Sequence, residues 1–165
     1  AILGWPGAHQ NWVRAGGALY GLSVVGDKTG ADFGLKPAMS LSTKLIAINH
    51  IKKGESIGYS ATWQCPEDMP VGVAAIGYGD GYPRNLSNLA WLLIGEKRKR
   101  ISGRICMDQI MVDVGSQKLK IGDEVVLIGT QGKQKITAEE LARLAKTIPY
   151  EIVCGLGSRI PRIYK

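Results

Sequence analysis

Apolar and polar residues alternate along much of the chain, and this alternation predicts a series of short β-strands. The apolar residues Met39, Leu41 and Leu45 are separated by polar ones, which is typical of a strand with one buried face. From apolar runs bounded by turn residues we expect further strands at residues 56–63, 72–76, 89–94, 101–107, 110–114 and 125–128. Glycine-containing turns separate these runs at intervals of roughly 8–12 residues, a spacing that predicts an antiparallel barrel or sandwich.

One stretch near the end of the chain has helical periodicity instead. Leu141, Leu144 and Ala145 fall on one face of a helix, and Thr137 and Glu140 have the spacing of a capping box at its start. The patterns together predict a mainly β, antiparallel barrel-like domain with one or two helices.

Residues 72–84 join a run of small apolar residues to a loop that has glycine at every second position. The run is typical of a strand covered on both faces. Glycines so spaced allow the backbone to bend sharply and to approach a neighbouring segment closely. Such a loop either forms the wall of a site, with Tyr78, Asp80 and Arg84 as contacts, or is a hairpin whose tyrosines cap the core.

Composition narrows the classes of function. A chain of 165 residues forms one domain, or one domain and a remnant of another. The net charge of +7 permits binding of nucleic acid or of an acidic ligand, and would suit a phosphate-bearing cofactor. The dense basic run at residues 97–100 lies between apolar runs, which predicts a solvated hairpin and a charged edge strand. The tyrosines cluster in glycine loops and do not interleave with basic residues, which argues against nucleic-acid binding.

Cysteine usage and the absence of targeting patterns predict a cytoplasmic protein. Cys65, Cys106 and Cys154 are odd in number and form no CxxC motif, which favours free thiols in a reducing compartment over a disulfide framework or a metal site. No apolar run reaches the roughly 18 residues of a membrane span, and no signal-peptide pattern opens the chain. The chain begins without methionine, which indicates a piece of a longer protein or a processed terminus.

Familiar catalytic motifs are absent from the sequence: it contains no Ser/His/Asp set, HExxH motif, Walker loop or dinucleotide-binding glycine motif. The remaining candidates are tyrosines and arginines, namely Tyr59, Tyr78, Tyr82, Arg14, Arg84 and Arg104. A tyrosine acts as a general acid or base where cations or donors lower its pKa from about 10. Arginines supply such cations and also hold carboxylates or phosphates. These residue types point to proton transfer on an anionic small molecule.

Several motifs occur in the order and spacing of a known enzyme family. The longest are Gly-Tyr-Gly-Asp-Gly-Tyr-Pro-Arg at 77–84 and Gly-Arg-Ile-Cys-Met-Asp at 103–108. Shorter matches lie at residues 12–14, 18–21, 39–41, 52–55, 58–63, 122–125 and 150–152. On these motifs the chain resembles, nearly end to end, the C-terminal part of alanine racemases. These are pyridoxal-phosphate enzymes that interconvert L- and D-alanine.

The resemblance implies an enzyme of two domains, a (β/α)8 barrel followed by a mainly β domain. Residues 1–30 then match the end of the barrel, and residues 31–165 match the β domain. No lysine of this chain matches the lysine that anchors the cofactor in the family, so this stretch alone is expected to be inactive. The family also implies a homodimer with an active site shared between subunits, alanine as substrate, and D-alanine supplied for peptidoglycan.

The resemblance assigns roles residue by residue. Tyr59 matches the catalytic tyrosine that removes the α-proton of L-alanine, while the family's lysine acts from the opposite face. Arg14 matches the arginine that hydrogen-bonds the pyridine nitrogen of the cofactor. Gly16 and Gly17 match positions whose backbone amides approach the cofactor phosphate, and Met107 matches the residue whose amide meets the substrate carboxylate.

Further matches concern access to the site. Tyr78, Arg84 and Arg104 match residues that line the channel through which substrate enters. Ser158 stands where some members have a tyrosine that reaches the cofactor phosphate, and where others have a small hydroxyl residue.

The sequence is compatible with three alternatives. Serine racemases of bacterial resistance systems share the same motifs, so the reaction type is better defined than the amino acid. The basic composition and the turn at 120–126, which resembles that of SH3-like ribosomal barrels, fit a nucleic-acid-binding barrel. A domain that has lost catalysis and serves interactions fits the absent lysine.

Overall fold

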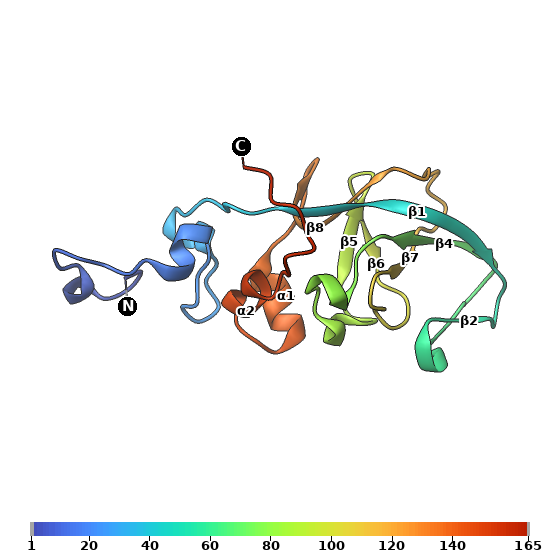
Figure 1. Cartoon of the computed structure of the whole chain (residues 1–165), viewed down its shortest axis with the longest axis horizontal. Helices are drawn as coiled ribbons and strands as arrows, with labels where there is room; N and C mark the ends of the chain where they lie inside the picture. The colour runs from blue at the N-terminus through green and yellow to red at the C-terminus, as the bar shows by residue number, and fades with distance from the viewer. Residues whose placement is uncertain (1, 165) are drawn as a thin grey trace.

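The computed structural model describes residues 2–164, and an antiparallel sheet forms its centre (Figure 1). The strands of this 7-stranded sheet follow the order β6-β5-β8-β1-β4-β7, with β9 paired to β8. Their bounds are β1 (Leu41–Ile51), β4 (Met69–Ala74), β5 (Trp91–Ile94), β6 (Lys97–Arg100), β7 (Ile110–Asp113), β8 (Glu124–Gln131) and β9 (Gln134–Ile136). A separate small hairpin consists of β2 (Ser56–Ile57) and β3 (Trp63–Gln64).

The two outer strands of this order meet, so the sheet closes on itself. Ile101, directly after β6, forms a bridge with Val112 of β7, and the amide of Ser102 donates to the carbonyl of Met111 at 2.9 Å. Closure leaves fewer strand edges that could pair with another chain. The prediction of a mainly β, antiparallel, barrel-like domain is confirmed.

Strand β1 holds the sheet together because it pairs with two different strands. Its first residues, from Leu41 to Lys44, pair with β8, and the residues from Leu45 to Ile51 pair with β4. The register against β4 shifts between Leu45 and Ala47, as at a β-bulge. Buried side chains of β1, β5, β7 and β8 form one apolar core with those of helix α1 (Ala138–Ala145).

Helix α1 begins as the sequence predicts, and it is followed by the short helix α2 (Pro149–Cys154). The Thr137 hydroxyl accepts a hydrogen bond from the amide of Glu140 at 3.2 Å, which caps the helix. The carboxylate of Glu140 does not complete the expected capping box. It instead accepts hydrogen bonds of 2.5 and 2.9 Å from the guanidinium of Arg98 in β6.

The basic run 97–100 is therefore part of the barrel wall. Arg98 is paired with Glu140, the ammonium of Lys99 donates to the carbonyl of Val114 at 2.5 Å, and Arg100 lies over the ring of Trp91. The hairpin and the charged strand expected here are present, and the bridge to β7 begins only after the strand, at Ile101.

Two predicted strands are wrong in extent. Residues 56–63 are interrupted by a 3-10 turn, η4 (Tyr59–Ala61), and most of 101–107 is a loop. Both irregularities arise where the two segments pack together through glycines. A Cβ atom on Gly103 would lie 2.9 Å from the carbonyl oxygen of Ile57, and one on Gly58 would lie 3.2 Å from the Arg104 amide nitrogen.

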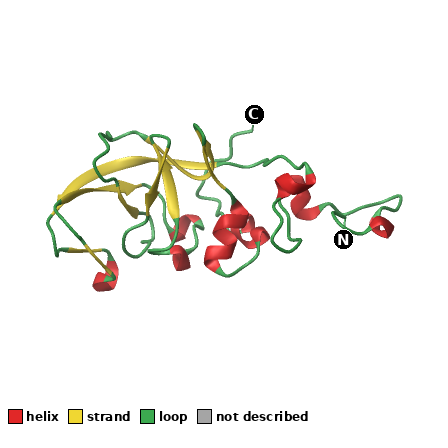
Figure 2. Cartoon of the chain, turned by 180° about the vertical axis from the view of Figure 1, so that it is seen from behind, coloured by secondary structure: helices red, strands yellow, loops and turns green. Residues whose placement is uncertain are grey.

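The N-terminal segment projects from one end of the molecule, as Figures 1 and 2 show. Residues 2–30 contain the 3-10 turns η1 (Pro6–Ala8) and η2 (Gly16–Tyr20) and no strand, and a third turn, η3 (Gly30–Phe33), follows. This segment does not by itself display the barrel end expected at residues 1–30, and residue 1 lies outside the described part. No helix within residues 2–164 is long and apolar enough to cross a membrane.

Candidate active site

The predicted catalytic tyrosine lies at the tip of the β2–β3 hairpin. Tyr59 begins η4, and its side chain is 68% exposed. It lines an open hollow together with Gly58 and with the loop residues Cys106, Met107, Asp108 and Gln109. The structure thus brings together Tyr59 and Met107, which stand far apart in the sequence.

Unusual backbone geometry presents Tyr59 at this tip. Ser60 and Ala61 both adopt left-handed conformations, with φ of 62° and 47°. Such conformations cost on the order of 1 kcal/mol each for residues with a side chain, and the surrounding structure must impose them. Asn88 provides one such contact: its side-chain amide donates to the Thr62 hydroxyl at 3.2 Å and its side-chain oxygen accepts from the Gly103 amide at 2.6 Å.

The glycine-rich loop packs on the Met107 loop through its backbone. In η5 (Tyr78–Asp80), the amide of Tyr78 donates to the carbonyl of Cys106 at 3.0 Å, and that of Gly79 to the carbonyl of Met107 at 2.9 Å. Glycine is required just before this turn, because a Cβ atom on Gly77 would lie 2.2 Å from the Cys106 oxygen. Tyr78 is consequently held beside Met107 with its side chain 40% exposed.

The other aromatic residue of this loop has a different position. Tyr82 is 1% exposed, and burial raises the pKa of its phenol, so this hydroxyl stays neutral and belongs to the core. Of the two tyrosines, Tyr82 therefore caps the core. Tyr78 lies on a loop whose backbone packs on the Met107 loop, and it is the Met107 loop that lines the hollow.

Arg104 and Arg84, which the resemblance matches to the entry channel, lie near residues of the hollow without lining it. Arg104 is half-buried behind Gly58. Arg84 is exposed at the start of η6 (Arg84–Leu86) and lies near enough for its positive charge to affect the pKa of the Cys106 thiol. Burial raises the pKa of Cys106, and the positive charge of Arg84 opposes that rise.

An ion-pair network beside Met107 was not predicted. Arg159 of the C-terminal tail donates to Asp108 at 2.5 Å and forms an ion pair with Asp80 at 3.3 Å. The three residues are distant in sequence and follow no shared motif spacing, so only the fold brings them together. Ser158, next to Arg159, is exposed.

The predicted cofactor-binding residues belong to the N-terminal segment, which lies at the opposite end of the molecule from β2 (Figure 1). Arg14 is exposed and lines a shallow hollow with Ile2, Ala8, Trp12 and Val13. Gly16 and Gly17 begin η2 and lie against the ring of Tyr150, where a Cβ atom on Gly17 would come within 2.8 Å of that ring. The structure does not bring Arg14 near Tyr59 within one copy of the chain.

Residues 38–164 match the family model described as "Alanine racemase, C-terminal domain". The chain belongs to this family. It is 48% identical over 163 residues to the alanine racemase of Nitrosococcus oceani, covering 98% of this chain and 45% of that protein. It is 41% identical over 166 residues to the alanine racemase of Piscirickettsia salmonis, covering 100% of this chain and 98% of that protein.

Solved alanine racemases have the same fold over this length. The enzyme from D-cycloserine-producing Streptomyces lavendulae superposes with a TM-score of 0.94 at 38% identity, over 99% of this chain and 43% of that one. The biosynthetic enzyme of Pseudomonas aeruginosa gives a TM-score of 0.91 at 38% identity, over 99% of this chain and 45% of that one. The chain spans less than half the length of these solved relatives.

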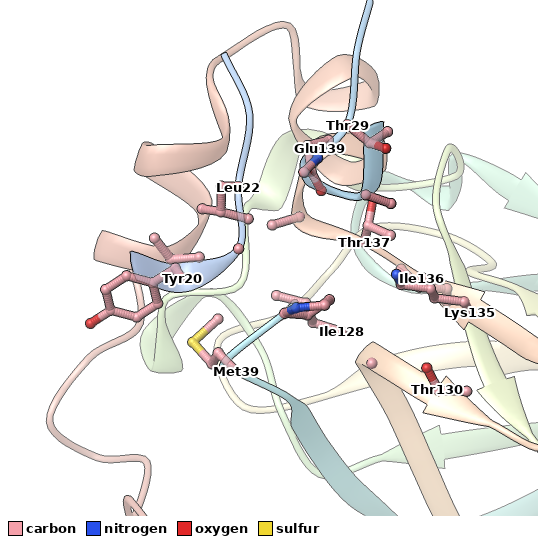
Figure 3. A pocket seen from close by; sticks show the side chains of 17 residues that line it. Tyr20, Leu22, Thr29, Met39, Ile128, Thr130, Lys135, Ile136, Thr137 and Glu139 are labelled. Carbon is pink, nitrogen blue, oxygen red and sulfur yellow. The ribbon is translucent and has the colours of Figure 1, made fainter. Parts of the chain in front are cut away.

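This alanine racemase C-terminal domain also contains a small cavity, of about 90 Å³, where the N-terminal segment packs on the barrel (Figure 3). Its lining is largely apolar and includes Leu22, Met39, Ile128 and Ile136. Glu139, only 8% exposed, accepts hydrogen bonds from the amides of Gly30 at 3.1 Å and Ser23 at 3.4 Å. None of the predicted site residues lines this cavity, so we assign it to the packing of the N-terminal segment.

Proposed function

We propose that this chain provides one part of an alanine racemase active site, in which Tyr59 exchanges the α-proton of alanine. The observation that carries this proposal is the shared hollow of Tyr59 and Met107, exposed at one end of a domain whose relatives are alanine racemases. Tyr59 contributes a hydroxyl to this hollow, and Met107 contributes a backbone amide that suits a carboxylate. Both groups are accessible, because Tyr59 is 68% and Met107 51% exposed.

Racemisation requires proton transfer on both faces of a planar carbon, because one base would otherwise have to move around that plane. We assign Tyr59 to the face from which L-alanine loses its proton. The opposite base and the anchoring lysine are proposed to come from a (β/α)8 barrel, which takes about 250 residues and is not contained in residues 2–164. We therefore expect the 165 residues alone to be inactive, with residues 1–30 completing that barrel and residues 31–165 forming the second domain.

The donors at the far end of the chain fit pyridoxal phosphate. The guanidinium of Arg14 is exposed, forms no ion pair within residues 2–164, and suits a ring nitrogen that accepts a hydrogen bond. Gly16 and Gly17 follow Arg14 at the start of η2, and backbone amides at such a turn suit a phosphate. When bound, the cofactor supplies the electron sink that makes the α-proton removable. Arg14 would donate to that ring nitrogen and would leave it unprotonated, because guanidinium retains its own proton.

A complete site needs two copies of the chain. The N-terminal segment, which carries Arg14, and the β2–β3 hairpin, which carries Tyr59, lie at opposite ends of one copy (Figure 1), and this separation supports a site built from two copies. We propose a homodimer in which Tyr59 and Met107 of one subunit face the barrel of the other. Tyr78, Arg84 and Arg104 would then line the access channel, where a polar, charged lining admits a small zwitterion such as alanine.

In the test, this chain is joined to the (β/α)8 barrel of an alanine racemase. Deuterium exchange at the α-carbon of each alanine enantiomer is then followed with pyridoxal phosphate present. Tyr59→Phe should lower exchange from L-alanine by about 10²–10⁴-fold and spare the first exchange of D-alanine, because the second base acts there. Tyr164→Phe, in the exposed tail, is the control. Undiminished exchange of L-alanine in Tyr59→Phe would refute the assignment, and an inactive wild-type assembly would refute the function.

Mixing two inactive variants tests the shared site. An Arg14→Met subunit combined with a Tyr59→Phe subunit forms dimers in which one site carries both changes and the other carries neither. Activity should recover to about a quarter of the wild-type value after random reassociation. No recovery, despite mixed dimers seen by native mass spectrometry, would place both residues in the same subunit's site.

A further inference from the structure

Three charged side chains from separate segments meet beside Met107. The guanidinium of Arg159 donates through Nη2 to Oδ1 of Asp108 at 2.5 Å, and its Nε lies 3.3 Å from Oδ1 of Asp80. The Asp80 carboxylate is the most enclosed member, with its side chain 14% exposed, and its Oδ2 accepts from the Gly77 amide at 2.9 Å. Arg159 thereby connects the C-terminal tail to the Met107 loop, which lines the hollow, and to the glycine-rich loop that packs on it.

The network is continuous with the backbone of Met107. Asp108 directly follows Met107, while Asp80 ends the turn whose Gly79 amide donates to the Met107 carbonyl. The guanidinium also packs tightly, because a Cβ atom on Gly79 would lie 2.7 Å from Nη1 of Arg159 and 2.9 Å from Cγ of Met107. The tail is fixed in turn by the Gly157 amide, which donates to the carbonyl of Asp80 at 2.8 Å.

The network also sets the charge next to the hollow. Asp80 and Asp108 without a cation would place two negative charges beside the amide that we assign to the substrate carboxylate, and like charges repel at this range. The hydrogen bond to Asp108 and the charge of Asp80 raise the pKa of Arg159, so the guanidinium remains cationic. With Arg159 present, the three side chains carry one net negative charge, instead of the two that the aspartates alone would carry.

We propose that Arg159 is a positioning residue for the substrate carboxylate: by bridging Asp80 and Asp108 it fixes the Met107 backbone and reduces the negative charge around it. This inference rests on the proposed function of Met107. Arg159 itself does not contact the reacting atoms in this scheme. Its loss should therefore weaken substrate binding and leave the proton-transfer step nearly unchanged.

The first test needs no racemase activity and uses the 165-residue chain. Hydrogen exchange is followed by NMR at the amides of Tyr78 and Gly79, which donate to the Met107 loop. Arg159→Met should lower their protection roughly five- to tenfold, because the bridge between the loops is lost. Arg159→Lys should restore part of it, since an ammonium keeps the charge without the fork of the guanidinium. Arg143→Met, at an exposed position of α1, is the matched control.

The second test measures alanine racemisation after a family barrel is restored. Arg159→Met should raise KM for alanine roughly five- to tenfold with kcat changed less than about twofold. Adding Asp108→Asn should recover part of the increase, because one of the two unpaired carboxylates is removed. Unchanged amide protection, or a fall in kcat at constant KM, would overturn the proposal. If the wild-type assembly does not racemise alanine, the proposed function fails and the amide exchange alone decides whether Arg159 fixes the loop.

Discussion

Gly77 offers a direct test of how the glycine-rich loop holds the candidate site. In Gly77→Ala the new Cβ atom would lie 2.2 Å from the carbonyl oxygen of Cys106 and 2.4 Å from that of Met107. Both contacts are to backbone atoms, so no side chain can turn away to relieve them. The two loops must separate by about 1 Å to reach ordinary van der Waals distance.

That separation disrupts two hydrogen bonds. The bonds from the amides of Tyr78 and Gly79 are 3.0 and 2.9 Å long, and a further 1 Å takes them beyond hydrogen-bonding range. Each contributes about 0.5–1.5 kcal/mol, for a loss of roughly 1–3 kcal/mol. Alanine also restricts the unfolded chain, which offsets about 0.4–1 kcal/mol, because the extended backbone at Gly77 suits any residue. We expect a net loss of about 1–2 kcal/mol.

The assay is urea unfolding of the 165-residue chain, followed by tryptophan fluorescence. Gly7→Ala is the control, because a Cβ atom there would meet nothing within 4 Å, and its effect should stay within about 0.5 kcal/mol. A Gly77→Ala variant as stable as the wild type would refute the close approach of the two loops.

Two other predictions concern regions outside this contact. Replacing Glu139 with alanine leaves the buried amide of Gly30 without its acceptor, so the free energy of unfolding should fall by about 2 kcal/mol. Limited proteolysis should then cleave first within residues 22–36, and an unchanged cleavage pattern would contradict the role of Glu139 in holding this segment. Iodoacetamide alkylates thiolates, and burial raises the pKa of Cys106. Alkylation of Cys106 at pH 8 should therefore be slower than alkylation of the exposed Cys154. The alkylation rate of Cys106 should also increase over a higher pH range than that of an ordinary thiol. Mass spectrometry of time points resolves the two sites, and equal rates would show that Cys106 is not shielded.

Local patterns were sufficient for most strands and for the start of α1. Alternation predicted the strand near Leu41, an apolar run after a turn predicted the strand near Val125, and the Thr137 cap was predicted because it involves neighbours in the chain. The family motifs in turn pointed to Tyr59 and Met107, which lie in one hollow.

The turn at Tyr59 could not be predicted in this way. Residues 56–63 read as a strand because their side chains favour one, yet Ser60 and Ala61 adopt positive φ. Contacts from Asn88 and the close approach of Gly103 impose this conformation, and both partners come from later in the chain. Tertiary contacts overrode local preference at the functional tip.

The partners of the charged side chains could not be predicted from the sequence either. Arg159 and Asp108 are 51 positions apart, and many other carboxylates of this chain were equally plausible partners before the fold was known. Glu140 is an example of a local prediction that failed. Its spacing from Thr137 predicted that its carboxylate would accept a hydrogen bond from the Thr137 amide, but the carboxylate accepts one from Arg98 of β6 instead.

The double pairing of β1 has a consequence for synthesis of this domain. The half of β1 that contains Leu45 meets its partner β4 early, whereas Leu41 must wait for Ile128 of β8. At roughly 5–20 residues per second, a ribosome needs on the order of 4–17 seconds to add the intervening residues. During that interval one side of β1 is an open strand edge on the nascent chain, and a chaperone that shields such edges would act most usefully there.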